Sequence, residues 1–232
     1  MMNQVDVKDL RQLKNLAEFL PVQLEKLAAH CTVKTFDRTE IIFDQDEDGR
    51  FLYLLVSGIA SLSYINSQKK QTIVSMLAAG EFFGLDSLTP QMRHPFRCEA
   101  FEDCTVGFIR PQAFIEILLG ASYEAFLRWY TAVIHPGRTS HVHCIKGIGL
   151  DLRRRLALEL LNLADRFGTP DSRGISIALN LSHEQLASIV GASRQQVTEY
   201  LNRFDHDNII FRDGRRIIID TEKLEKILNL VT

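Results

Sequence analysis

The side chains best suited to specific recognition lie close together near the C-terminus, in the segment SRQQVTEYLNRF that begins at Ser193. The Arg194 guanidinium can donate two hydrogen bonds to guanine, the Gln195 amide matches the exposed edge of adenine, and the Glu199 carboxylate can accept from the amino group of cytosine. Ser193 and Thr198 carry hydroxyls that suit phosphate oxygens. The chemistry that these residues predict is the reading of base edges in a DNA groove.

This segment has the apolar spacing of a helix with one buried face. Val197, Leu201 and Phe204 recur at intervals of four and three residues and share that face with Tyr200. Asn202 falls on the opposite face with the polar residues named above. The spacing therefore predicts a helix that packs on its domain through the apolar side and presents long polar side chains outward.

Two helix starts flank a glycine in this region. Ser182 is followed three residues later by Gln185, and Ser193 by Gln196, and each pair makes a capping box. Gly191 lies between them, where a short turn requires a left-handed backbone. These signals predict a helix-turn-helix, whose second helix enters the major groove of DNA. The plain alternative is a solvated helix face without a ligand.

A hairpin is predicted directly after this motif. Residues 209–220 are rich in β-forming side chains and turn at Asp213 and Gly214, which suits the wing of a winged helix-turn-helix.

The charge of this region limits how it can meet DNA. Residues 151–232 carry equal numbers of basic and acidic side chains, so any phosphate-binding surface must be local. Arg153 to Arg155 and Arg212 could supply it, although the former group could equally pair with nearby acids. The predicted DNA-contacting residues are Ser182, Ser193, Arg194, Gln195, Thr198, Glu199, Asn202, Arg215 and Arg216.

The first half of the chain is predicted to be an all-β unit. Short β-rich runs are separated by turn-forming residues such as Ser57-Gly58 and Ala79-Gly80. This pattern favours a small antiparallel barrel or jelly roll with helices on either side. The expected strands are 40–43, 51–56, 60–65, 72–77 and 104–109.

A long helix is predicted between the β-rich unit and the helix-turn-helix. Phe126, Trp129, Tyr130 and Val133 form a broad apolar stripe, which is either core of one subunit or the seam of a two-helix dimer. The helix should kink or break at His135-Pro136-Gly137, because proline removes a backbone donor. The expected division is 1–122 for the β-barrel unit, 123–148 for the long helix and 149–232 for the winged helix-turn-helix.

Composition excludes several classes of protein. The 232 residues are 46% hydrophobic, with 27 Lys and Arg against 29 Asp and Glu, unlike a disordered, collagenous or wholly polyanion-binding chain. No run is long and apolar enough to span a membrane, and the first twenty residues lack a secretory signal pattern. The four cysteines are scattered without a CxxC pair, so we expect a cytoplasmic protein. The sequence carries none of the nucleophile, zinc or phosphate-loop motifs of an enzyme.

The chain resembles the cyclic-AMP receptor/FNR superfamily of bacterial transcription regulators over essentially its whole length. The resemblance is carried by LASIVGASRQQVTEYLNRFDHDNIIFRDGRRIIIDTEKL, by LDLRRRLALELLNLAD, and by the LLVSG and AGEFFG runs. It implies an α+β fold with an N-terminal antiparallel β-barrel or jelly roll of cyclic-nucleotide-binding type, a long dimerisation helix and a C-terminal winged helix-turn-helix. It also implies a homodimer on double-stranded DNA, contact with RNA polymerase and a small-molecule effector.

The predicted effector pocket departs from the pattern of cyclic-AMP binders. Those members follow the glycine that matches Gly84 with a glutamate and later use an Arg-Ser pair for the cyclic phosphate. This chain has Leu85 after the glycine and reads Arg93-His94-Pro95-Phe96 in the later loop, although Asp86 and Arg93 or Arg97 could substitute. A signal other than cyclic AMP is therefore expected. The candidate pocket residues are Gly84, Leu85, Asp86, Arg93, His94, Arg97, Ser140 and His141.

Histidines raise a haem or metal alternative, since haem-sensing relatives place an axial histidine in the loop of His94. No pair among His94, His135, His141, His143 and Cys144 has a dedicated metal spacing, so no metal site is predicted and the cofactor stays open. An iron-sulfur cluster is disfavoured because Cys31 is the only cysteine near the N-terminus. The alternative function is a small-molecule, haem or redox sensor whose DNA-binding domain is silent or secondary.

Overall fold

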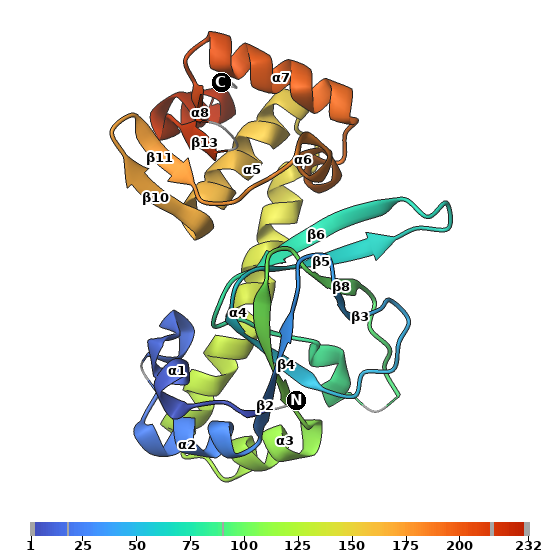
Figure 1. Cartoon of the computed structure of the whole chain (residues 1–232), viewed down its shortest axis with the longest axis vertical. Helices are drawn as coiled ribbons and strands as arrows, with labels where there is room; N and C mark the ends of the chain where they lie inside the picture. The colour runs from blue at the N-terminus through green and yellow to red at the C-terminus, as the bar shows by residue number, and fades with distance from the viewer. Residues whose placement is uncertain (1–2, 18, 90, 214–215, 230–232) are drawn as a thin grey trace. The chain divides into compact units, whose positions relative to one another are not determined.

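The computed structural model describes residues 3–17, 19–89, 91–213 and 216–229 (Figure 1), without the side chains of residues 134–145, 213 and 229. The chain divides into two compact units, Met1–His141 and Val142–Thr232. Gly214 of the turn predicted at Asp213 and Gly214 lies outside the described residues, as does the predicted DNA contact Arg215.

Two antiparallel sheets form the N-terminal unit, which confirms the predicted β-barrel or jelly roll. The five-stranded sheet has the order β1-β2-β9-β4-β7, and the four-stranded sheet has the order β3-β8-β5-β6. The strands of the first sheet are β1 Asn3–Gln4, β2 Cys31–Phe36, β9 Cys104–Ile109, β4 Leu52–Ser57 and β7 Phe82–Phe83. Those of the second are β3 Ile41–Phe43, β8 Arg97–Ala100, β5 Ala60–Ile65 and β6 Gln71–Leu77.

Strand β4 shows how the sheets create two cores. Because side chains alternate along a strand, Leu52 and Leu54 point to one face and Tyr53 and Leu55 to the other. All four are buried. Tyr53 and Leu55 pack with residues of both sheets, such as Phe43 and Val106, while Leu52 and Leu54 pack with the surrounding helices. A continuous apolar run in the sequence thus becomes a strand that is covered on both faces.

Short helices cover the outer face of the five-stranded sheet. Prolines at the first turn begin two of them, where a missing N–H costs nothing. Their buried side chains join one cluster with the strand residues, as Leu24 and Phe114 do. The helices are α1 Val7–Gln12, α2 Pro21–Ala29 and α3 Pro111–Leu119, with 3-10 turns at Lys14–Leu16 and Leu85–Leu88.

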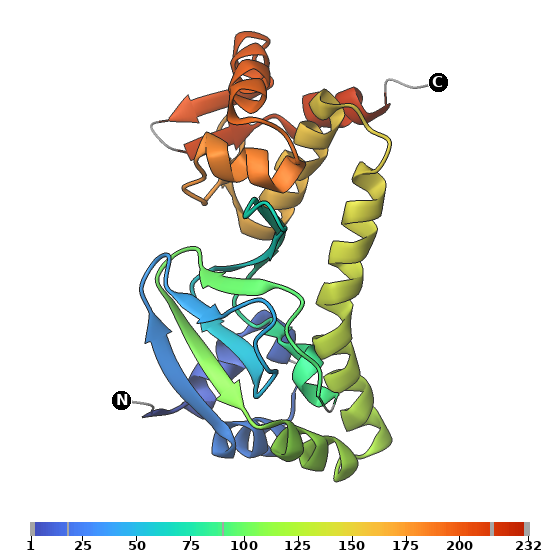
Figure 2. The same cartoon turned by 90° about the vertical axis from the view of Figure 1, so that its right-hand side faces the viewer.

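Helix α4 runs without interruption from Tyr123 to Gly147, as Figure 2 shows. The predicted break at Pro136 is therefore wrong. An internal proline costs about 3 kcal/mol because one backbone hydrogen bond is lost. The turn before it is held by burial of Trp129, Ala132 and Val133, and Trp129 packs edge-on against Phe19 at 4.5 Å and Phe114 at 5.6 Å. Burial of these three side chains therefore outweighs the free-energy cost of the internal proline.

The C-terminal unit is a winged helix-turn-helix, as predicted. Its four antiparallel strands have the order β10-β11-β13-β12 and pack with α5, which also packs with α8. The predicted wing is formed by β12 and β13, whose register pairs Ile210 with Ile219. The elements are α5 Leu152–Phe167, β10 Gly168–Asp171, β11 Gly174–Ile177, α6 His183–Val190, α7 Arg194–His206, β12 Ile210–Asp213, β13 Arg216–Ile219 and α8 Thr221–Asn229. Within the described ranges, no helix is long and apolar enough to cross a bilayer.

Candidate nucleic-acid interface and effector region

Both capping boxes predicted for the helix-turn-helix are present. The Ser182 hydroxyl accepts from the Gln185 N–H at 3.1 Å, and the Gln185 side chain accepts from the Ser182 N–H at 2.9 Å. Ser193 and Gln196 repeat the arrangement at 3.2 Å and 3.1 Å. Each serine hydroxyl also donates to its glutamine at 3.0 Å. These serines therefore fix where α6 and α7 begin, in addition to any contact they make with phosphate.

The turn between the helices depends on Gly191. Its φ of 66° lies in the left-handed region, and its N–H closes α6 on the carbonyl of Ala187. Ala187, Val197 and Leu201 are buried, so the two helices pack through small and branched side chains. The apolar face of α7 is thus fixed to its domain and the opposite face is left in solvent.

Arg194, Gln195, Glu199 and Asn202 are all exposed on that opposite face of α7. The Arg194 guanidinium makes no hydrogen bond or ion pair with any described residue, so its donors are available. Glu199 differs, because it accepts from Arg203 one turn later at 2.5 Å. Glu199 would have to leave Arg203 before it could accept from a base.

Arg212 of the wing contacts α7, the second helix of the helix-turn-helix, which we call the recognition helix. Its guanidinium donates to the Asn202 side-chain oxygen at 2.9 Å and lies 3.8 Å from the Asp205 carboxylate. Arg216 is exposed on the neighbouring strand β13. The two predicted DNA contacts therefore differ. Asn202 is already hydrogen-bonded within the domain, whereas Arg216 remains in solvent.

The arginines at the start of α5 have three different surroundings. Arg155 donates to the carbonyl of Val190 at 3.0 Å and to that of Leu150 at 2.9 Å, so it holds α5 against the end of α6. Arg154 lies 3.9 Å from the Asp151 carboxylate, and Arg153 is exposed. Arg155 thus supports the fold of the motif, and Arg153 remains in solvent.

His183, at the first position of α6, is a polar residue of this region that sequence reasoning missed. Its Nδ1 lies 2.8 Å from the Thr198 hydroxyl, which in turn donates to the Arg194 carbonyl at 2.8 Å. Burial lowers the pKa of His183, and the positive charges of Arg212 and Arg194 lower it further. Fifteen residues separate His183 from Thr198, so helix periodicity gives no signal for this contact.

The effector region of the barrel begins at Gly84, whose φ of 70° places it in the left-handed region. A Cβ on this residue would come within 2.6 Å of the Tyr53 ring, so glycine is required. Leu85 packs against the apolar cluster that the short helices form with strand residues such as Leu52 and Leu54. Asp86 lies 3.4 Å from His94 Nδ1, which brings two predicted pocket residues together.

His94 is buried within the aromatic core rather than displayed in an open pocket. Only 1% of its surface is exposed, its ring stacks on Phe43 at 3.9 Å, and Tyr53 lies 6.1 Å away. Its Nε2 is buried and has no hydrogen-bond partner among the described residues. The imidazole therefore fills the space between the two sheets.

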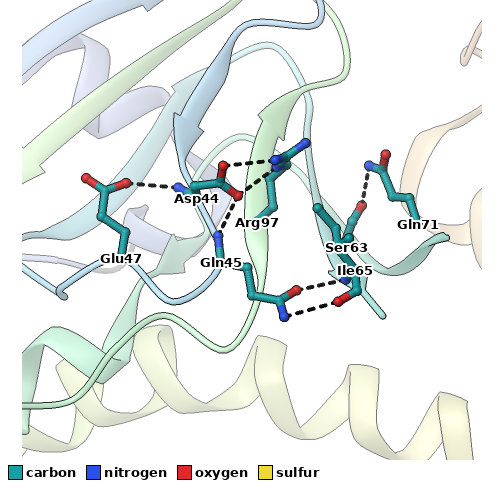
Figure 3. Close-up of polar contacts among 7 residues, drawn as sticks. All are labelled: Asp44, Gln45, Glu47, Ser63, Ile65, Gln71 and Arg97. Carbon is teal, nitrogen blue, oxygen red and sulfur yellow. Dashed lines mark hydrogen bonds and ion pairs between the residues drawn. The ribbon is translucent and has the colours of Figure 1, made fainter. Parts of the chain in front are cut away.

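Arg97 lies in a closed ion pair with Asp44, shown in Figure 3. Its Nε and Nη2 donate to the two carboxylate oxygens, both at 2.8 Å. This hydrogen bonding holds the pKa of Asp44 below its ordinary value and raises the pKa of Arg97. Next to the pair, the Gln45 amide makes two hydrogen bonds with the main chain of Ile65, at 2.8 Å and 3.2 Å. The cation of Arg97 is thus already neutralised.

The remaining pocket candidates do not converge on one described site. Arg93 is exposed, lies 3.5 Å from the Asp48 carboxylate and donates to the Asp46 carbonyl at 3.3 Å. Ser140 and His141 lie on α4, and their side chains are outside the described part. No group of three or more His, Cys, Asp or Glu side chains among those described could hold a metal ion.

Two family profiles match separate parts of the chain. The profile of the cyclic nucleotide-binding domain matches residues 33–120, which contain most of the barrel. The profile of the Crp-like helix-turn-helix domain matches residues 154–227, which contain the recognition helix and the wing.

Curated relatives align with most of the chain. The CRP-like cAMP-activated global transcriptional regulator of Mycobacterium tuberculosis is 25% identical over 193 residues, which cover 82% of this chain and 85% of the relative. The global nitrogen regulator of Synechococcus elongatus is 28% identical over 207 residues, which cover 86% of each.

Solved structures share the fold at lower identity. A CRP-family transcriptional regulator from Thermus thermophilus superposes with a TM-score of 0.71 at 24% identity, covering 84% of this chain and 96% of that one. A CooA mutant from Carboxydothermus hydrogenoformans gives a TM-score of 0.73 at 21% identity and covers 98% of both chains.

Proposed function

The chain belongs to the cyclic-AMP receptor/FNR superfamily of transcription regulators, and from this premise we propose that it binds specific DNA sites as a homodimer under control of a signal other than cyclic AMP. Homologues of this family regulate transcription and catalyse no reaction, so the chain is not an enzyme. Its expected partners are double-stranded DNA, a second copy of itself and, by analogy with the family, RNA polymerase. A cytoplasmic location follows from this role.

The observation that carries the proposal is the exposed Arg194 near the start of a recognition helix that is capped at Ser193 and fixed through Val197. A helix held in this way can enter the major groove with its first turn against the bases. An arginine in water keeps its two-pronged donor geometry for guanine. Gln195, exposed beside it, supports adenine recognition.

The homodimer is supported by an apolar face of α4 that the barrel does not cover. Tyr123, Phe126, Leu127 and Tyr130 follow the spacing of one helix face and are exposed, with 72% exposure for Tyr123 and 52% for Tyr130. The Phe126 and Tyr130 rings stack at 6.4 Å. The opposite face of the same helix is buried through Trp129. A second α4 would remove these rings from water and leave two recognition helices related by symmetry.

A signal other than cyclic AMP is supported by the state of the charged groups in the barrel. A cyclic phosphate needs a cation with available donors, and a ribose hydroxyl suits a carboxylate acceptor. Arg97 has its donors on Asp44, Arg93 is paired at the surface with Asp48, and Leu85 offers no acceptor. His94 fills the space beside Phe43. The effector is therefore expected to be a small molecule of different chemistry.

The proposal is tested by sedimentation of the purified full chain and by gel-shift assays against genomic fragments. We expect a dimer in solution and discrete complexes with a subset of fragments that resist competitor DNA. Tyr130→Glu should give a monomer with weakened fragment binding, because a charge at the seam opposes association. Tyr64→Glu, at an exposed tyrosine of β5, is the matched control and should change neither property. A wild-type monomer, or a chain that binds no fragment more tightly than competitor DNA, would contradict the proposal.

A further inference from the structure

A continuous chain of polar contacts links the first residue of α6 to the first turn of the recognition helix. His183 Nδ1 lies 2.8 Å from Thr198 Oγ1, and this hydroxyl donates to the main-chain carbonyl of Arg194 at 2.8 Å. Thr198 is half-buried between them. Its hydroxyl is therefore used within the domain rather than left free for a phosphate.

The hydrogen-bond directions determine which atom of His183 faces outward as a donor. A hydroxyl has one proton, and that of Thr198 goes to the Arg194 carbonyl, so Thr198 accepts and His183 Nδ1 carries a proton. In the neutral imidazole, Nε2 is then an acceptor. When Nε2 is also protonated, the contact with Thr198 is unchanged and Nε2–H becomes a charged donor. No other hydrogen bond to this imidazole occurs among the described residues.

The charges around His183 come mostly from the two elements that carry the DNA-reading surface. Arg194 lies on α7 and Arg212 on β12, and both positive charges act on the imidazole. Its own helix adds Glu184, which is exposed, and the α5 arginine Arg155 is bonded to the far end of α6. Burial and the two arginines lower the pKa of His183, which favours the neutral ring in the free protein. An approaching phosphate would reverse the local potential.

We propose that His183 is a DNA-backbone contact positioned by Thr198, and that a phosphate bound there converts it to a charged donor, so that DNA binding takes up a proton. This inference rests on the proposed DNA-binding function. It adds a residue to the interface and makes the affinity depend on pH. An imidazole locked at Nδ1 presents Nε2 in one orientation, so little side-chain freedom is lost when phosphate binds.

The direction of the pH effect follows from linkage. If the pKa of His183 is higher in the complex than in the free protein, affinity rises as the pH falls through the pKa of the complex. It becomes constant once the pH is below the pKa of the free protein. One proton allows at most about a tenfold change in affinity per pH unit within that window. The window lies in the range where histidine ordinarily titrates, about pH 5 to 8.

The test uses the full chain and a fluorescent mixed-sequence duplex of about 30 base pairs, since a backbone contact does not need a known operator. Affinity is measured by anisotropy across the histidine range for wild type, His183→Gln and His206→Gln. His206 is the matched control because it ends α7 with its side chain 89% exposed. We expect the wild type and His206→Gln to bind the duplex more tightly as the pH falls. His183→Gln should lack the part of this pH dependence that comes from the imidazole. At low pH, the slope of log K against log salt should be about 0.9 steeper for wild type than for His183→Gln.

Two variants separate positioning by Thr198 from loss of the imidazole. Thr198→Val removes the hydroxyl, so the proton-linked component should shrink although His183 is present. Thr198→Ser keeps the hydroxyl and should restore it. A third measurement needs no variant at all: the imidazole NMR signals of His183 should titrate at a higher pH with the duplex than without it.

Different outcomes would overturn the role of His183 and the DNA-binding function on which that role rests. If wild type binds the duplex but His183→Gln has the same pH profile and salt slope, His183 is not a proton-linked backbone contact. An unchanged titration of the His183 signals on adding duplex would also contradict that role. If no variant, including wild type, binds any duplex, the proposed DNA-binding function itself is wrong and the inference falls with it.

Discussion

Two arginines predicted to bind ligands, Arg194 on the recognition helix and Arg97 on the barrel, have opposite surroundings. Arg194 is exposed with its guanidinium unpaired among the described residues, whereas both sides of the Arg97 fork meet the Asp44 carboxylate at 2.8 Å. An arginine that contacts bases needs donors that are not already used within the protein. An arginine that links β8 to the end of β3, as Arg97 does, uses its donors within the sheet. We therefore propose that arginine contacts DNA in one unit, whereas in the other it holds an ion pair within the barrel.

The histidines repeat this contrast. His183 is half-buried, with one ring nitrogen held by Thr198, and no contact of the other is found among the described residues. His94 is stacked on Phe43 in the barrel core, where both of its nitrogens are removed from solvent. The helix-turn-helix therefore leaves polar groups in solvent, whereas the barrel packs rings between its sheets and pairs Arg93 and Arg97 with acids nearer the surface.

The largest effect, on the free energy of unfolding, is expected from a substitution that leaves a cavity in the barrel interior. Tyr53 is buried, with ring centroids of Phe43, Phe83 and Phe108 between 5.0 and 5.2 Å away. Tyr53→Ala should lower the free energy of unfolding by about 3–5 kcal/mol, because both the transfer of the ring and the contacts around the resulting cavity are lost. Urea denaturation measures the loss. Tyr64→Ala, at an exposed ring on β5, should change stability by less than about 0.5 kcal/mol. Equal losses in the two variants would show that the barrel interior is not tightly packed.

The next effect is expected on DNA binding without a change in stability. Arg194→Ala should weaken binding to a selected site by about 1–3 kcal/mol, since a bidentate contact with guanine is lost. Its melting temperature should match that of wild type because the side chain is exposed. Lys226→Ala, at an exposed lysine on α8, controls for the loss of one positive charge and should retain the sequence preference. Equal affinity of wild type and Arg194→Ala would remove Arg194 from the interface.

A smaller effect is expected from opening the Asp44–Arg97 pair. The side chains are 45% and 26% exposed, so solvent screening limits the loss in Asp44→Asn to about 1 kcal/mol or less. Because Arg97 lowers the pKa of Asp44 in the folded state, this stabilisation is present above the ordinary carboxyl pKa. It is lost as the pH falls through the lowered pKa of the folded protein. Urea unfolding of wild type and Asp44→Asn should therefore differ at neutral pH and converge in acid. A constant difference would mean that the ion pair is not its source.

No effect is expected from cyclic AMP. A ligand at 100 times its Kd stabilises a protein by about 2.7 kcal/mol, which thermal melting readily detects. Since Arg97 and Arg93, the two candidate phosphate-binding cations, are paired with acids, melting of the full chain should not change across a cyclic-AMP titration. A saturable rise in melting temperature would show that Arg97 or Arg93 exchanges its carboxylate for the cyclic phosphate, and the contrast between the two regions would then weaken.

The helix-turn-helix was predictable from sequence because its signals are local. Ser182 with Gln185 and Ser193 with Gln196 each lie within one helical turn, and Gly191 is required by a backbone angle rather than by distant packing. Five strands of the barrel unit were also predicted where apolar runs met turn residues, namely β3, β4, β5, β6 and β9, whereas β1, β2, β7 and β8 were not expected. The hairpin of β10 and β11 was not expected, because Gly168 and Pro170 were interpreted as a simple helix breaker.

The contacts that the residues of the effector region make could not be predicted in this way. Asp44 and Arg97 are 53 positions apart, and only the pairing of β3 with β8 brings them together. The continuity of α4 through Pro136 likewise depends on burial of Trp129 against residues such as Phe19. Sequence patterns report local preferences, and these features are decided by contacts between distant segments.

Sequencing of the DNA retained from a random pool by the full chain and by Arg194→Ala tests the central claim most directly. The wild-type chain should enrich two symmetric half-sites about one helical turn apart, with a guanine in each half-site that Arg194→Ala no longer selects. Enrichment of the same sequence by both proteins, or of none by the wild type, would contradict recognition of DNA by the surface that Arg194 begins.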